Sequence, residues 1–160
     1  MSAPVMAPVS ARALVSEAFF ERLTKRVEKK HDVTSELAER ITEQTLAYLA
    51  TCATKPAGTP SLGMCPTVDL GWHAFLEYSK AYDEFFAAHG WRKVHHNPSD
   101  EPGETYESSR VVIPRTMEAM ERAGYVVDRP LWATPSAAYS CGGDDSDGKP
   151  GDPNPCGDHG

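Results

Sequence analysis

Three residues whose side chains bind metals or carry protons follow one another at four-residue intervals: Asp69, His73 and Glu77. In an α-helix, residues four apart lie one above the other on the same face. The spacing therefore predicts two carboxylates that flank an imidazole on one side of a helix. Such oxygen and nitrogen donors suit a divalent transition metal, with zinc, manganese and iron as the candidates.

Two more histidines stand close behind in the sequence. His95 and His96 follow Gly90, a residue type that commonly ends a helix, and Pro98 stops the segment. If this segment folds back over the helix, either imidazole can join the three residues before it. The metal-site hypothesis therefore names five ligands: Asp69, His73, Glu77, His95 and His96.

The same residues have a structural explanation that the spacing favours. Asp69 would cap the helix or complement its dipole, and His73 would make one hydrogen bond. Glu77 would pair with Lys80, three residues further on. The zinc-protease motif His-Glu-x-x-His is absent, as are a glycine-rich phosphate loop and a serine-nucleophile elbow. The sequence therefore leaves any reaction and any catalytic residue open.

A second group of metal-binding residue types stands near the C-terminus, namely Cys141, Cys156 and His159. The two cysteines are too far apart for a zinc knuckle, and three ligands leave a structural zinc site incomplete. A disulfide between Cys141 and Cys156 is an open alternative, and an inert tail is the simpler expectation.

The elements that must position the central residues are helices. The pattern predicts one amphipathic helix that begins near Val68 and ends at Gly90. Its other arc is aromatic, which predicts that this helix is the centre of the core. The aromatic residues are Trp72, Phe75, Tyr78, Tyr82, Phe85 and Phe86.

Helical patterns also precede and follow this stretch. Apolar residues at helical spacing predict helices over residues 11–30 and 35–54, with Asp32 or Thr34 available as a cap of the second. A further helix is expected to start at Pro114, a residue type common at the first helical position, and to end at Gly124. Residues 110–113 before it could be a short extended piece or a helical lead-in. The pattern therefore predicts an all-α fold with about four helices.

The domain organisation follows from composition. Residues 11–135 are expected to form one small helical domain. Residues 1–10 are expected to form a flexible leader because they contain prolines and no helical pattern. Residues 136–160 are rich in Gly, Asp, Pro and Cys and have almost nothing to bury, so a disordered tail is expected there.

Charge and hydropathy exclude several classes of protein. The net charge of −7 argues against a nucleic-acid-binding protein, whose surface is usually basic. No apolar run approaches the roughly 18 residues of a membrane span, and the first residues make a poor signal peptide. We therefore expect a cytoplasmic protein that binds neither nucleic acid nor membranes.

The central stretch resembles the glycine-rich-domain-containing-protein-like family of plants and many bacteria, in particular a bacterial member. The family motif is approximately Asp-x-x-Trp-His-x-His, then Tyr and Phe at helical spacing, then Gly and His-x-Pro. The matching residues are Val68-Asp69-Leu70, Trp72-His73, Tyr78, Tyr82, Phe85, Gly90 and His95-His96-Asn97-Pro98. This chain departs at Phe75, where many members carry a second histidine. The resemblance implies a helical domain and names no specific activity.

Two functions follow from these observations. The first is a small helical binding or interaction module without enzymatic activity, whose partner would be a protein. The alternative is a metal-binding protein, in its most developed form a metal-dependent hydrolase, with a site on the helix face of Asp69, His73 and Glu77. The two functions differ in whether that face meets the segment of His95 and His96.

Overall fold

The computed structural model of the 160-residue chain describes residues 6–96 and 108–133. It confirms the all-α prediction, with more helices than the expected four and, among the described residues, no strand beyond an isolated bridge. The elements are the 3-10 helix η1 (Ala11–Leu14) and the α-helices α1 (Glu17–His31), α2 (Ser35–Thr54), α3 (Pro66–Leu76), α4 (Ser79–His89), α5 (Ser109–Arg122) and α6 (Arg129–Trp132).

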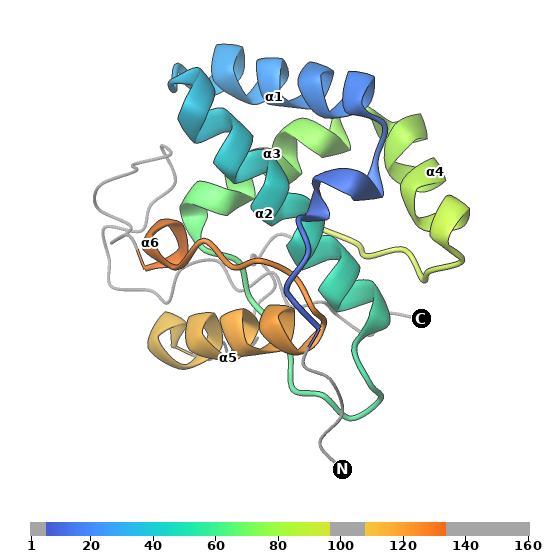
Figure 1. The fold of residues 1–160 in the computed structure, drawn as a ribbon, viewed down its shortest axis with the longest axis vertical. Helices are drawn as coiled ribbons and strands as arrows, with labels where there is room; N and C mark the ends of the chain where they lie inside the picture. The colour runs from blue at the N-terminus through green and yellow to red at the C-terminus, as the bar shows by residue number, and fades with distance from the viewer. Residues whose placement is uncertain (1–5, 97–107, 134–160) are drawn as a thin grey trace, which may run out of the picture.

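The core is centred on α2. In Figure 1 this helix runs through the middle of the molecule, and α1, α3 and α5 all contact it. Every residue from Gln44 to Cys52 is buried, so α2 is covered on all sides. A helix that is covered in this way is an interior helix rather than a surface helix. The aromatic stretch therefore contributes a large share of the core, but α2 is the central element.

Local hydrogen bonds explain where the first two helices begin. The predicted helix over residues 11–30 is interrupted at Ser16, whose hydroxyl oxygen accepts a hydrogen bond from the backbone N–H of Phe19 and starts α1 anew after η1. The predicted second helix agrees with α2. Of the two candidate caps it is Thr34 that caps this helix, by accepting a hydrogen bond from the N–H of Leu37 at 3.2 Å.

The predicted single aromatic helix consists of two helices, α3 and α4, which meet at a bend at Glu77 and Tyr78. Tyr78 has φ −92° and ψ 62°, outside the helical region. In a straight helix, Trp72 and Tyr82 would lie about 15 Å apart along the axis. The bend brings their side chains together, so that the indole N–H of Trp72 donates to the hydroxyl oxygen of Tyr82 at 2.9 Å. Aromatic side chains of both halves are thereby buried in one core.

Helix α5 begins before Pro114, so residues 110–113 are helical rather than extended. Its first residue is Ser109, and Pro114 lies inside it rather than at its start. Ser108 caps the helix by accepting a hydrogen bond from the N–H of Arg110 at 3.2 Å. Proline removes one backbone hydrogen bond from a helix interior. Near it in the same helix, the buried Thr116 accepts a hydrogen bond from the backbone N–H of Gly63 at 3.0 Å, which ties α5 to the connector before α3.

The last residues of the predicted leader pair with the end of α5. The backbone N–H of Val9 donates to the carbonyl oxygen of Gly124 at 2.8 Å, and the N–H of Val126 donates to the carbonyl oxygen of Val9 at 3.0 Å. The segment before η1 is therefore fixed to the helical domain at Val9, although the sequence placed all of residues 1–10 in a flexible leader.

Some expectations concern residues outside the described ranges. The predicted tail, residues 136–160, lies there together with Cys141, Cys156 and His159. Over the ranges that the structure does describe, none of the helices has both the length and the apolar character that crossing a bilayer requires.

Helix α3 packs very closely on α2 at Gly71. A Cβ atom added to Gly71 would lie 2.1 Å from Oγ1 of Thr45 and 2.9 Å from Cγ2 of Ile41. The Thr45 hydroxyl also lies between the helices, 2.8 Å from the carbonyl oxygen of Ile41 and 3.1 Å from that of Val68. Only glycine leaves room for this contact, so Gly71 sets the distance between α2 and α3.

We expect Gly71→Ala to lower the free energy of unfolding by about 1–3 kcal/mol, because overpacking of a buried contact forces neighbouring atoms to shift. Urea unfolding followed by circular dichroism measures this change. In a Thr45→Ala background the same substitution should have a smaller effect, since the atom nearest to the new methyl group is gone. Strictly additive losses in the double variant would contradict this account of the contact.

Candidate functional site

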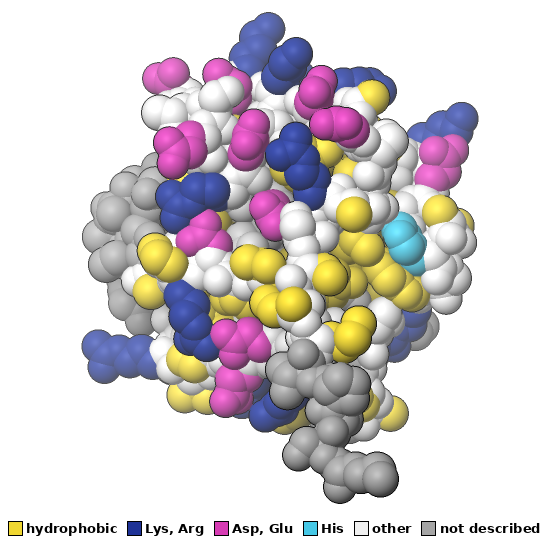
Figure 2. Space-filling view, viewed as in Figure 1, with side chains coloured by type: hydrophobic (Ala, Val, Ile, Leu, Met, Phe, Trp, Pro, Cys, Tyr) yellow, Lys and Arg dark blue, Asp and Glu magenta, His cyan; other side chains and the backbone are white. Residues whose placement is uncertain are grey.

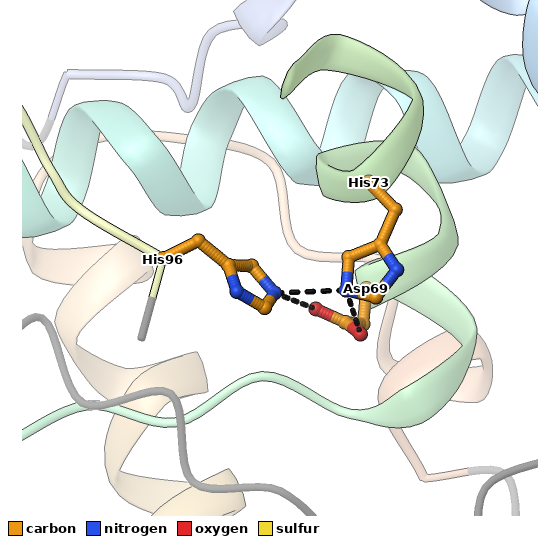
Figure 3. A group of neighbouring side chains, drawn as sticks. All are labelled: Asp69, His73 and His96. Atoms are coloured by element: carbon orange, nitrogen blue, oxygen red, sulfur yellow. Dashed lines mark hydrogen bonds and ion pairs between the residues drawn. The ribbon is translucent and has the colours of Figure 1, made fainter. Parts of the chain in front are cut away.

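The side chains of Asp69, His73 and His96 converge on one point at the surface of α3, as Figure 3 shows. The Nε2 atoms of the two histidines lie 2.8 Å apart. Nε2 of His73 is 3.1 Å from one carboxylate oxygen of Asp69, and Nε2 of His96 is 3.3 Å from the other. The structure thus brings together three of the five residues that the metal-site hypothesis named.

The start of α3 positions two of these residues. Pro66 occupies the first turn, where its missing N–H costs no hydrogen bond, and Asp69 follows in the same turn. A carboxylate at this position is favoured by the positive end of the helix dipole. His73 lies one turn later on the same face. The predicted i, i+4 relation of Asp69 and His73 therefore holds, with Asp69 in the first turn rather than at the cap.

The third residue arrives on the segment after α4. Gly90, with φ 68°, ends that helix in the left-handed conformation that glycine adopts readily. The following residues have no helical structure, and Val94 is buried whereas His95 is exposed. In an extended segment successive side chains point to opposite sides, so His96 returns to the inner side with Val94.

The cluster contains more close contacts between polar atoms than there are hydrogen atoms to form hydrogen bonds in them. Each imidazole Nε2 carries at most one hydrogen, and an ionised carboxylate carries none. At most two of the three close contacts among Asp69, His73 and His96 can therefore be hydrogen bonds. The remaining pair of electronegative atoms would be in contact without a hydrogen between them. A cation between the three groups would satisfy all of their lone pairs at once.

Asp69 is ionised in this environment. Its side chain is 19% exposed, and burial alone would raise the pKa of its carboxyl group. The hydrogen bonds from His73 and His96, together with the positive charge that these imidazoles can carry, outweigh that effect and hold the pKa of Asp69 below its ordinary value. The cluster therefore offers one carboxylate and two imidazoles as ligands.

The other two predicted ligands lie apart from the cluster. Glu77 is bonded to Arg26 and Lys30 of α1, with Nε of Arg26 2.7 Å from its carboxylate. Lys80, the partner expected in the structural explanation, pairs with another glutamate of α4. His95 is exposed to solvent. The bend after α3 accounts for the position of Glu77, because it ends the straight helix face on which the prediction relied.

Trp72 and Tyr82, which the sequence places in the core, also contact His96 and the segment that carries it. The indole ring of Trp72 lies 4.5 Å from the imidazole ring of His96, centroid to centroid. The hydroxyl group of Tyr82 donates a hydrogen bond to the carbonyl oxygen of Val94 at 2.5 Å. These contacts could have been anticipated from the sequence, because a buried Trp or Tyr carries a polar atom that needs a hydrogen-bond partner.

A groove of about 690 Å³ lies away from the cluster, between the N-terminal part of α1 and α4. Figure 2 shows hydrophobic side chains gathered on this face, with a histidine beside them. Its apolar lining residues include Leu14, Val15, Phe19, Ala81, Phe85 and Ala88. The groove and the cluster are thus separate features of the surface.

The low pKa of Asp69 predicts how its contribution to stability depends on pH in metal-free protein. A carboxylate with a depressed pKa stabilises the fold above the unfolded-state pKa of about 3.9, and this contribution disappears as the pH falls through the folded-state value. Asp69→Asn should therefore be less stable than the wild type by about 1 kcal/mol near pH 6. Urea unfolding in the presence of EDTA should show the difference shrink below pH 4, and a constant difference would contradict the prediction.

Comparisons with family models, with curated proteins and with solved structures each found no match to this chain. The resemblance to the glycine-rich-domain-containing-protein-like family stays a prediction that rests on the residues quoted for it.

Proposed function

We propose that this protein binds a divalent transition metal ion through Asp69, His73 and His96. The observation that carries the proposal is the convergence of the two Nε2 atoms and the carboxylate within 2.8–3.3 Å of one another. Hydrogen bonds account for at most two of these three contacts, whereas a shared cation accounts for all of them. All three residues also belong to the motif of the family that the sequence resembles.

The spacing of the donor atoms agrees with a common coordination sphere. Ligand atoms at about 2.0–2.2 Å from an ion are about 3.4 Å apart in the tetrahedral geometry of zinc and about 3 Å apart in octahedral geometry. The nearest donor atoms of the cluster are 2.8, 3.1 and 3.3 Å apart. Two imidazoles and one carboxylate on one side of an ion form the type of site that holds zinc or iron(II) and leaves other positions open.

The proposal is tested by zinc titration of untagged, metal-free protein, followed by calorimetry. We expect about one equivalent to bind to the wild type, as three protein ligands at one site imply. Alanine at Asp69, His73 or His96 should weaken binding by about 100-fold or more, since each substitution removes a direct ligand.

The chain offers matched controls for this titration. His95→Ala removes a neighbouring imidazole that is exposed, and Glu77→Gln removes a carboxylate that is bonded to α1. Both variants should bind zinc as the wild type does. A wild type without bound zinc, or equal losses in the controls, would refute the proposed site.

Hydrolytic activity is a second candidate function, favoured by the exposure of the site. The side chain of His73 is 46% exposed, so water can reach an ion held by three protein ligands. A zinc ion lowers the pKa of its bound water to about 7 and so supplies hydroxide near neutral pH. The interaction module expected from the sequence is a weaker candidate. The groove beside α4 could receive a partner, but its lining mixes apolar residues with the charged Arg22, Lys80 and Glu84 and does not single out one ligand.

We expect the zinc-loaded wild type to hydrolyse activated esters such as 4-nitrophenyl acetate faster than the metal-free protein does. A zinc ion held by Asp69, His73 and His96 would supply hydroxide as the nucleophile, so the rate should rise with pH through the pKa of the bound water. His96→Ala at the same total zinc is the control for free zinc in solution. Equal rates for this variant and the wild type would exclude hydrolysis at the site and leave metal binding as its function.

A further inference from the structure

The segment that carries His96 leaves α4 at Trp91, whose ring stacks on that of His89 with centroids 4.2 Å apart and also contacts Phe85. At its start, the N–H of Trp91 donates to the carbonyl oxygen of Phe86 at 2.9 Å. Further along, Lys93 pairs with Asp83 at 2.5 Å, but both side chains are exposed, at 41% and 61%. Exposed ion pairs hold their partners weakly. The position of the segment near the cluster must therefore depend on its buried contacts.

Tyr82 makes a buried hydrogen bond to the backbone of Val94, two residues before His96. Its ring is 2% exposed, and its hydroxyl group donates to the carbonyl oxygen of Val94 at 2.5 Å. The hydroxyl oxygen of Tyr82 in turn accepts a hydrogen bond from the indole N–H of Trp72 at 2.9 Å. One hydroxyl group thus joins α3, α4 and the backbone two residues before His96.

Val94 and Trp72, the two hydrogen-bond partners of Tyr82, both restrict the position of His96. Val94 fixes the backbone from which His96 extends, and the ring of Trp72 lies against the imidazole of His96 at 4.5 Å with an interplanar angle of 64°. These contacts restrict the side chain from two directions. The Nε2 atom of His96 is thereby directed at Asp69 and His73.

We propose that Tyr82 is a positioning residue of the metal site, whose hydroxyl group fixes the ligand His96 through Val94 and Trp72. The inference rests on the proposed function, since it assigns a role toward the same ion. Groups that orient a metal ligand without touching the metal change affinity by about 10–100-fold when removed. Tyr82 is placed to have this effect although it lies in the aromatic core.

Tyr82→Phe isolates the role of the hydroxyl group. Phenylalanine retains the ring that packs on Phe75 and Phe86, each at 5.1 Å between centroids, and removes both hydrogen bonds. The matched control is Tyr78→Phe. Tyr78 packs on Phe19 of α1, with ring centroids 5.7 Å apart, rather than on the segment of His96. Each variant thus loses one tyrosine hydroxyl group from the same part of the chain.

Two measurements test the inference. The first is the zinc affinity of wild type, Tyr82→Phe and Tyr78→Phe, measured by calorimetry. The second is the NMR signals of the His96 imidazole in metal-free protein, assigned with His96→Ala and displaced by the ring of Trp72 beside it. We expect Tyr82→Phe to bind zinc about ten-fold or more weakly and to move the His96 signals toward those of an unstructured histidine. Tyr78→Phe should match the wild type in both measurements.

A purely structural role of Tyr82 would lower thermal stability and leave both measurements unchanged, and that result would overturn the inference while the metal site stands. Equal losses of zinc affinity in the two variants would overturn it as well. If the wild type binds no zinc, the proposed function fails and the inference with it. The NMR signals distinguish the two failures, because they show whether Tyr82 holds His96 in place even when no metal is bound.

Discussion

The close contact between α2 and α3 at Gly71 determines how the rest of the described structure is arranged. Residues two positions before and after Gly71 lie about 200° around the helix from it, and these residues are Asp69 and His73. The face that meets Thr45 of α2 and the face that carries the cluster are thus opposite sides of one helix. Tight packing on one side fixes the direction of the polar side chains on the other.

Features that depend on neighbours in sequence could be predicted. The bounds of α2 followed from apolar spacing, and its cap Thr34 is one of the two polar residues in front of it that were available for this role. The shared face of Asp69 and His73 followed from helical geometry alone. In both cases the deciding interactions span four residues or fewer, which is the range over which helical periodicity holds.

Features that depend on distant contacts could not be predicted. The bend at Tyr78 arises because rings of α3 and α4 pack together, and no residue there has the breaking tendency of glycine or proline. Whether His95 or His96 joins the cluster depends on which side of the segment faces the interior. Val94 is buried, so His96, two residues later in an extended segment, points to the same side. The apolar side chain of Val94 was a local indication of this in the sequence.

The pairing of Val9 with Gly124 and Val126 has a consequence for the folding of the domain. Two hydrogen bonds join the stretch before η1 to the stretch after α5, and these stretches are more than one hundred residues apart in the sequence. Closing so long a loop costs more chain entropy than joining two consecutive helices does. Contacts between distant residues also slow folding relative to local ones. The pairing of Val9 is therefore a contact that the helices between its partners must first bring within reach.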